Sequence, residues 1–292
     1  VILNDNRAKN AIALFNYFLK LDYDKVVSVF HGFELGAYFD SPSLPIKLLG
    51  INKRLLKILN KIKTIVAISK DEKQMWDHRF PDLRHKTKIV YHGVCEDIFY
   101  KRTPQEVNSL KRQHAIPLDK RIILSASRLV DRKRQDVVIK AFNEIHKDHE
   151  DVMLYIAGDG PLKETLETMA NSLEISDKII FLGSLDREQL SAYYAMSYLF
   201  ALTSKFEPFG LVYLEAAACG LPLISGNNGG VTDVVFNDIN GYCIDPENVE
   251  ELNVKLKQLL EDEALYTRLA TTAHQLYKDN YTCQQSALRL LQ

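Results

Sequence analysis

Hydrophobic and polar residues are distributed along this chain in two alternating patterns. Continuous apolar runs, such as 121–125 and 152–157, are separated by segments in which apolar residues recur every three or four positions, such as 136–146. The first pattern is typical of strands buried on both faces of a sheet, and the second of amphipathic helices. The pattern therefore predicts an α/β fold of βαβ units with parallel strands. Further strands are predicted at 26–30, 64–68, 88–91, 178–182, 197–202 and 221–225, and further helices at 162–173 and 187–195.

A polar segment from about Phe99 to Leu118 interrupts this alternation. It contains Pro104 and Pro117, and we interpret it as a linker between two domains. The residues before it show about three strands, where a doubly wound domain needs five or six, so we expect the N-terminal domain to be incomplete. The predicted divisions are 1–100 for a partial N-terminal acceptor-side domain, 101–118 for the linker, 119–280 for the C-terminal domain and 281–292 for a helix that packs back toward the N-terminal domain.

Composition and charge narrow the class of protein. The 292 residues are 46% hydrophobic and 26% charged, with a formal net charge of −1. This is the composition of a globular protein with room for two domains, and the charge gives no overall attraction to nucleic acid. No apolar run approaches the roughly 18–20 residues that span a bilayer. The four cysteines, Cys95, Cys219, Cys243 and Cys283, are far apart in the sequence without a CxxC pair, which favours a reducing cytoplasm.

Residues suited to phosphate groups follow the first two strands of the C-terminal half. Ligands of open parallel sheets bind at the carboxyl ends of the strands. Arg128 and Lys133 belong to a basic loop after the strand at 121–125, and together a planar guanidinium and a compact ammonium suit a diphosphate. A solvated basic loop would have the same sequence. The next strand is followed by Gly158-Asp159-Gly160-Pro161, which predicts either a phosphate-binding turn or a tight turn before a helix.

The segment EPFGLVYLEAAACG contains two carboxylates on either side of a predicted helix start. Glu207 precedes the helix and Glu215 lies inside it, with seven residues between them. The N–H groups of Gly210, Leu211 and Val212 would be free at the helix N-terminus and would attract an anion. A carboxylate within an apolar helix needs a hydrogen-bond donor, which could be a sugar hydroxyl or the protein backbone. Glu207 either faces an open cleft or caps the helix.

Together these stretches resemble the family-four retaining glycosyltransferases, also described as glycosyl transferases group 1, which have the GT-B fold. The resemblance runs from about residue 26 to the last helix and includes the ordered pairs Arg-x4-Lys and Glu-x7-Glu. It implies two Rossmann-like domains that face each other across a cleft, with a nucleotide-diphosphate sugar held by the C-terminal domain. The resemblance is strongest in SASRLVDRKRQD, YIAGDGP, FLGSL, EPFGLVYLEAAACGLPLI and GGVTDVVFNDINGYCIDP.

The resemblance implies that the basic pair and the helix start bind the donor's phosphates. Arg128 and Lys133 would hold the diphosphate and stabilise it as the leaving group. The backbone N–H groups of Gly210, Leu211 and Val212 would add to this grip. The leaving diphosphate would help to accept the acceptor's proton, so no protein base is assigned.

The same resemblance implies roles for four further residues. Glu215 would accept hydrogen bonds from the nucleotide ribose, and Glu207 would contact the transferred sugar near its reacting carbon. Leu185, in FLGSL, stands where the family stacks its nucleobase. His31, in VVSVFHGFE, stands where the family often has a histidine that faces the donor sugar.

The implied activity is the metal-independent, retaining transfer of a hexose-like sugar to a glycan or lipid-linked acceptor in bacterial polysaccharide assembly. Asp22-Tyr23-Asp24 has the metal-binding spacing of a different glycosyltransferase fold, but it precedes a predicted strand and favours a surface loop. We therefore expect no metal and no cofactor. The basic amphipathic helix from Lys53 to Lys63 predicts a solvated face or, alternatively, peripheral contact with an anionic membrane on its cytoplasmic side.

Three other functions fit this sequence less well. A nucleotide-sugar epimerase would need its own acid and base residues, for which we find no match. A binding protein without transfer activity is an alternative for a chain that lacks the start of its first domain. A nicotinamide dehydrogenase needs GxGxxG, but Gly158-Asp159-Gly160 is followed by Lys163 rather than glycine.

Overall fold

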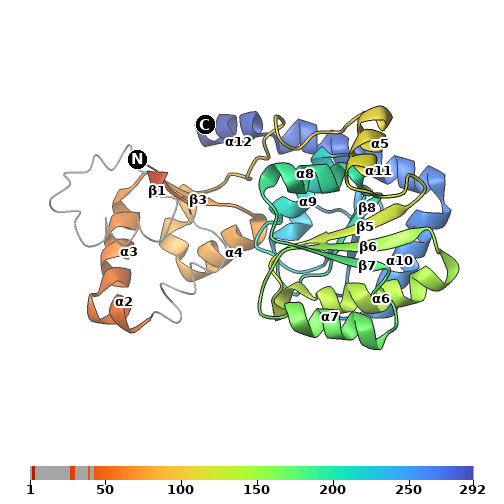
Figure 1. Cartoon of the computed structure of the whole chain (residues 1–292). Coiled ribbons are helices and arrows are strands. Elements are labelled where there is room, and N and C mark those ends of the chain that lie inside the picture. Colours follow the sequence, from red (N-terminus) through yellow and green to blue (C-terminus); the bar gives the residue numbers. More distant parts are fainter. Residues whose placement is uncertain (1, 4–26, 30–38, 40–42, 292) are drawn as a thin grey trace. The chain divides into compact units, whose positions relative to one another are not determined.

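The chain forms two compact units in the computed structural model, which describes residues 2–3, 27–29, 39 and 43–291 (Figure 1). The first unit is Val1–Tyr91 and the second is His92–Gln292, so the division precedes the predicted linker at 101–118. Most of that segment is helix α5 (Pro104–Gln113), which packs against α8 (Arg187–Met196). Proline is well tolerated at the first helical position, and here Pro104 begins a helix with a capping box. The segment therefore belongs to the second unit.

The first unit contains a four-stranded parallel sheet in the order β1-β2-β3-β4. Leu55, Ile58 and Leu59 recur on one side of the basic helix at 51–61 and give it an apolar face. This face packs with Trp76 in the core of the first unit. The strands predicted at 26–30, 64–68 and 88–91 are confirmed. The described residues of this unit form β1 (Ile2–Leu3), β2 (Val27–Val29), α2 (Leu44–Leu48), α3 (Ile51–Lys61), β3 (Thr64–Ala67), α4 (Lys70–Arg79), η3 (Pro81–Lys86) and β4 (Thr87–Ile89).

The second unit contains a six-stranded parallel sheet in the order β10-β9-β8-β5-β6-β7. Counted from the first strand of this unit and read from β7, this is the 3-2-1-4-5-6 order of a doubly wound Rossmann-like domain. The predicted α/β class and the parallel sheets are confirmed. The strands are β5 (Arg121–Ala126), β6 (Val152–Ala157), β7 (Ile179–Gly183), β8 (Leu199–Leu202), β9 (Leu223–Gly226) and β10 (Gly241–Ile244).

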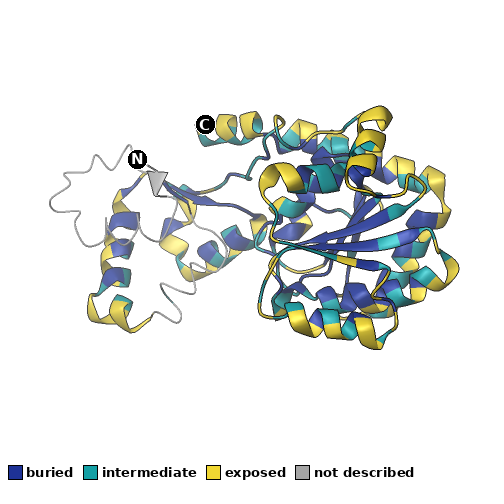
Figure 2. Ribbon diagram, viewed as in Figure 1, coloured by how far each residue is buried: buried dark blue, intermediate teal, exposed yellow. Residues whose placement is uncertain are grey.

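Helices cover both faces of the second sheet, and Figure 1 shows α8 and α9 on the opposite side from α6 and α7. The central strands are therefore fully buried, as their continuous apolar sequences predict (Figure 2). On one face, Phe142 of α6 and Leu256 of α10 share a core with Ile123 and Leu154 of the sheet. The remaining elements are η4 (Asp131–Lys133), α6 (Gln135–Asp148), α7 (Lys163–Ser172), α9 (Leu211–Ala218), η5 (Gly230–Asp233), α10 (Val249–Glu261), α11 (Glu263–Asn280) and α12 (Cys283–Leu291).

The apolar pattern did not predict the edge strand β10. It has only four residues and opens with Gly241, so it lacks a long apolar run. Gly241 is required by packing, because a Cβ there would lie 2.1 Å from the carbonyl oxygen of Leu223 on β9. Within the described part of the chain, no helix has the length and apolar character needed to cross a membrane. The placement of 281–292 relative to the first unit stays a prediction.

Candidate functional site

The site lies at the carboxyl ends of β5 and β8, where the order of strands reverses. Strand β5 pairs with β6 on one side and with β8 on the other. The connections from these strands leave toward opposite faces of the sheet, which opens a crevice between their exits. The loop after β5 contains Arg128 and Lys133, and the loop after β8 contains Glu207. The topology therefore brings together residues that are 74 positions apart in the sequence.

Lys133 and Glu207 form a buried ion pair across the two loops. The ammonium of Lys133 donates to Oε2 of Glu207, and the side chains are only 8% and 11% exposed. The hydroxyl of Ser204 also donates to Oε2 of Glu207, at 3.4 Å. Burial lowers the pKa of Lys133, and the nearby Glu207 carboxylate opposes this effect. The pair is thus a preformed, nearly neutral unit rather than a free cation beside a free carboxylate.

Backbone contacts hold these two loops in register. The N–H of Lys205 donates to the carbonyl of Arg132 at 2.8 Å, and Nη1 of Arg132 donates back to the carbonyl of Phe206 at 3.2 Å. The N–H of Glu207 donates to the carbonyl of Asn228, in the loop after β9, at 3.1 Å. The backbone that carries Glu207 is therefore fixed from both sides.

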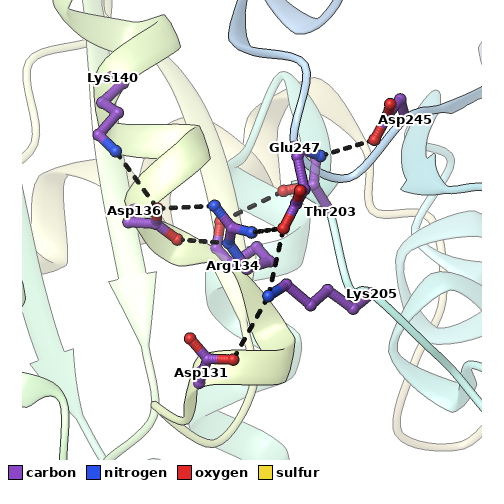
Figure 3. Close-up of polar contacts among 8 residues, drawn as sticks. All are labelled: Asp131, Arg134, Asp136, Lys140, Thr203, Lys205, Asp245 and Glu247. Carbon is purple, nitrogen blue, oxygen red and sulfur yellow. Dashed lines mark hydrogen bonds and ion pairs between the residues drawn. The ribbon is translucent and has the colours of Figure 1, made fainter.

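A network of charges around Arg134 extends this arrangement to the loop after β10 (Figure 3). Arg134 has a left-handed backbone with a φ of 53° and donates to both carboxylate oxygens of Asp136, at 2.9 and 3.1 Å. Its Nη1 also reaches Oε1 of Glu247 at 2.6 Å, and Lys205 contacts the same oxygen at 3.2 Å. The Thr203 hydroxyl donates to the Arg134 carbonyl at 3.2 Å. Because Arg134 follows Lys133 directly, the network anchors the backbone that carries the lysine.

Helix α9 begins beside Glu207 at Gly210, which has a φ of 100°. Such a backbone favours glycine, and a Cβ here would lie 2.7 Å from the Tyr213 ring. No described residue accepts a hydrogen bond from the N–H groups of Gly210, Leu211 or Val212. The predicted free donors at this helix start are therefore present.

Glu215 lies on α9 in a half-buried position and is bound by a tyrosine. The hydroxyl of Tyr194, on α8, lies 3.2 Å from Oε2 of Glu215 and 3.1 Å from the carbonyl oxygen of Val212, and these two acceptors share its single proton. Burial raises the pKa of Glu215 to about 7, although the Tyr194 hydrogen bond and the charge of Arg187 act in the opposite direction. The carboxylate thus has a structural partner and can still accept a hydrogen bond on its other oxygen.

A pocket of about 400 Å³ opens beside this helix start. This volume is within the usual range for small-molecule sites. Three predicted donor-binding residues, Arg128, Leu185 and Val212, line it together. Arg128 is exposed, and no described residue forms an ion pair with its guanidinium. The rest of the lining is Ala126, Ser127, Ala157, Gly158, Asp159, Ser184 and Leu190.

The Gly158-Asp159-Gly160 turn forms one wall of the pocket by packing closely on the β5 exit. A Cβ on Gly158 would lie 1.9 Å from the carbonyl oxygen of Ser127, and one on Gly160 would lie 2.4 Å from that of Leu129. The N–H of Leu129 donates to the carbonyl of Asp159 at 2.9 Å. Both glycines are therefore explained by packing, and the turn positions Ser127 and Asp159 at the pocket.

The structure groups the predicted site residues into two neighbouring sets. Arg128, Leu185 and Val212 line the pocket, whereas Lys133 and Glu207 pair with each other outside its lining. Sequence reasoning missed Tyr194, whose only signal was its place in an amphipathic helix. The predicted residue His31 and the motif Asp22-Tyr23-Asp24 lie outside the described residues.

Comparison with known proteins defines the class to which this arrangement belongs. Residues 106–276 match the model of the family described as Glycosyl transferases group 1. The match covers more than half of the 292 residues, and it includes both loops and the whole of α9. The chain belongs to this family.

Two relatives and one solved structure show how similar individual members are. A GDP-mannose-dependent alpha-(1-6)-phosphatidylinositol monomannoside mannosyltransferase from Mycolicibacterium smegmatis is 32% identical over 179 residues, 59% of this chain and 47% of the relative. An N-acetyl-alpha-D-glucosaminyl L-malate synthase from Bacillus anthracis is 28% identical over 261 residues, 89% of this chain and 65% of the relative. The crystal structure of Anabaena Alr3699/HepE in complex with UDP and glucose has a TM-score of 0.80 at 21% identity, covering 99% of this chain and 76% of that chain.

These comparisons confirm the family and the fold. At 21% identity the Anabaena structure is evidence of a shared fold alone. The chain spans about half of the first relative's length and about two thirds of the second's. The activity of the whole protein, its donor and its acceptor are therefore matters of proposal.

Proposed function

We propose that this protein transfers a sugar from a nucleotide-diphosphate sugar to a glycan or lipid-linked acceptor, with retention of configuration, in polysaccharide biosynthesis. The observation that carries the proposal is the pocket at the β5, β6 and β7 exits, lined by Arg128, Leu185 and Val212 and bordered by the start of α9. The guanidinium of Arg128 suits a phosphate, and the apolar side chain of Leu185 suits a nucleobase. The free N–H groups at the start of α9 suit a further anionic group. The names of the relatives, which include a GDP-mannose-dependent enzyme, support a nucleotide-sugar donor.

The donor's diphosphate would lie between Arg128 and the N–H groups at the start of α9. Arg128 is exposed and available, whereas Lys133 is already paired with Glu207. A diphosphate near Lys133 would compete with Glu207 for the lysine ammonium. A carboxylate oxygen of Glu207 would then be free to accept a hydrogen bond from a sugar hydroxyl. Positive charge from Arg128, Lys133 and the helix start would then stabilise the leaving group.

The acceptor would attack from the face that the diphosphate leaves, and the diphosphate would help to accept its proton. This route needs neither a metal nor a protein base, so we propose a metal-independent reaction. Glu215 would bind the ribose through the carboxylate oxygen that Tyr194 does not occupy. The nucleobase would stack on Leu185.

The first unit offers a surface for the peripheral membrane contact that a lipid-linked acceptor would need. Lys53, Arg54 and Lys57 of α3 are exposed, whereas most apolar residues of this helix are buried in the core and Leu56 is half-buried. This helix would therefore bind an anionic membrane by charge and not by insertion. The double variant Lys53→Ala/Lys57→Ala should reduce flotation with phosphatidylglycerol vesicles.

A matched control for that experiment is available on α6. Lys140→Ala/Lys147→Ala removes the same charge from exposed positions of the second unit and should leave flotation unchanged. Equal loss in both double variants would show a general charge effect and would contradict a specific role for α3.

The proposed activity is tested by product formation with a panel of nucleotide sugars, including UDP-glucose and GDP-mannose, and candidate acceptors. We expect a product whose anomeric configuration by NMR matches that of the donor, and activity that survives EDTA. Glu207→Gln should abolish most turnover while nucleotide binding by calorimetry changes little. Glu164→Gln, at an exposed position of α7, is the matched control and should behave as wild type. Binding without product, for the wild-type protein, would favour a non-transferring binding protein.

A further inference from the structure

Two cysteines, one near the start and one near the end of the second unit's sequence, lie next to each other in the fold. Cys95 and Cys283 are 188 positions apart, and their sulfur atoms are separated by 2.7 Å. This distance is shorter than the 3.5–4.0 Å at which even nonbonded carbon atoms meet, and it approaches the roughly 2.05 Å of a disulfide bond. Cys283 is exposed and Cys95 is half-buried, so a small reagent can reach the pair.

Backbone hydrogen bonds hold the segment at 93–95 against the segment at 281–283. Val94 and Thr282 form a parallel bridge, in which the N–H of Val94 donates to the Tyr281 carbonyl at 2.9 Å. The N–H of Cys283 donates to the Val94 carbonyl at 3.3 Å. The backbone at Gly93 packs directly on this segment, because a Cβ there would lie 2.4 Å from the Thr282 carbonyl oxygen. The two thiols are therefore held together by neighbours on both sides.

We propose that Cys95 and Cys283 are a redox-active pair that forms a reversible disulfide within one chain. Each thiol loses a proton, the pair loses two electrons, and one S–S bond forms. The oxidant is a small disulfide, such as glutathione disulfide, which is reduced to two thiols by exchange. Cys219 and Cys243 serve as internal comparisons, because Cys219 is buried and Cys243 contacts Ser225 and the Val235 carbonyl instead.

The cross-link would also restrain the candidate site. The rings of His92 and Tyr281, which flank the joined segments, lie 5.7 and 6.3 Å from the ring of Phe209. Phe209 stands between Glu207 and Gly210 in the loop before α9. Oxidation should therefore reduce the mobility of this loop, because the two segments that pack on Phe209 would be tied together.

The experiment compares the full chain before and after incubation with glutathione disulfide, followed by alkylation of the remaining thiols. We expect a monomer whose mass before alkylation is about 2 Da lower than that of the reduced chain, and two of its four thiols should resist alkylation. A non-reducing digest should link the Cys95 and Cys283 peptides. Dithiothreitol should restore all four thiols. Four free thiols at equilibrium, a stable glutathione adduct or a disulfide-linked dimer would each overturn the proposal.

Serine variants supply the controls. Oxidation should raise the melting temperature of the wild-type protein and of Cys243→Ser by about 5–10 °C, because the link closes a very long loop. The shift should be absent from Cys95→Ser and Cys283→Ser. Hydrogen exchange of the segment around Phe209 should slow in the oxidised wild type. If either serine variant fails to fold, the peptide map of the wild type decides the matter alone.

Discussion

Burial turns Lys133 and Glu207 from two separate charged residues into one ion pair. In the sequence each looks available to a ligand, whereas in the fold each is the other's partner. Removing two charges from water is costly, and their mutual attraction recovers the cost only while both are present. The pair is therefore a structural unit as well as a candidate binding site, and variants of one residue alone test both roles at once.

A double-mutant cycle separates these roles. Lys133→Met or Glu207→Gln alone should each lower the free energy of unfolding by about 3 kcal/mol, because each leaves a partner without its counterpart. The double variant should lose clearly less than the sum of the two. Urea denaturation of the four proteins measures the coupling, and strictly additive losses would contradict a buried ion pair.

Glu215 predicts a pH dependence of stability. Its pKa is about 7 in the folded protein and near the ordinary 4.5 in the unfolded chain. Between these values the folded state holds a proton that the unfolded state has released. The free energy of unfolding should therefore fall as pH rises from about 4.5 to about 7, by about 3 kcal/mol, and remain level above that range.

Glu215→Gln should remove this contribution. Relative to wild type, the variant should gain stability between pH 5 and pH 8, as measured by urea denaturation at several pH values. Glu164→Gln provides the comparison, because that carboxylate is exposed on α7. A constant difference between Glu215→Gln and wild type at all pH values would show that the Glu215 pKa is not raised.

At the scale of elements, turns decide how closely the strand exits approach one another. The turn after β6 packs its glycines against carbonyl groups of the loop after β5, and this contact forms one wall of the pocket. Strand β7 ends at Gly183, which also has a positive φ, but a Cβ on this residue would meet nothing within 4 Å. Substitutions at Gly158 and Gly183 can therefore be compared, because both test backbone conformation and only the first also tests close packing.

Gly158→Ala should be much more damaging than Gly183→Ala. Both positions have a positive φ, of 127° and 67°, so both substitutions cost about 1 kcal/mol or more of unfolding free energy. Only at position 158 would the new Cβ also clash with the Ser127 carbonyl, whereas nothing lies within 4 Å at position 183. Nucleotide binding by calorimetry should be lost in Gly158→Ala and retained in Gly183→Ala. Equal losses would show that the turn does not shape the pocket.

At the scale of the whole molecule, the second unit has its own sheet, core and candidate site. Its compact boundary falls between Tyr91 and His92, and the family match lies entirely within it. The contacts of residues 92–95 with the segment 281–283 close this unit at its two ends. The unit therefore meets the structural requirements of an independent domain.

A fragment of residues 92–291 should fold on its own and bind nucleotides. We expect a single cooperative thermal transition, and binding of UDP or GDP within about threefold of the affinity of the full chain. Differential scanning calorimetry and titration calorimetry measure the two properties. A fragment that starts at residue 119, as the predicted linker would suggest, lacks α5 and the 92–95 segment and should be clearly less stable.

Much of the fold was predictable because local patterns determine it. Apolar runs such as 121–125 and 197–202 are buried on both faces in any parallel sheet, so their composition indicates their place. Exceptions were short or glycine-led elements, such as β10, and the helix that begins at Pro104, which the sequence did not predict because proline marks both helix starts and loops.

The sequence alone determined the α/β class and the family, since these depend on residue type and spacing, and for the same reason it predicts which loops bind phosphate. Only the tertiary structure decided which side chains meet. The reversal of strand order at β5 and β8 pairs Lys133 with Glu207, close packing of α8 on α9 gives Glu215 its tyrosine, and the return of the chain brings Cys95 to Cys283. Such contacts join residues far apart in the sequence, and no local pattern records them because they depend on how the whole sheet is wound.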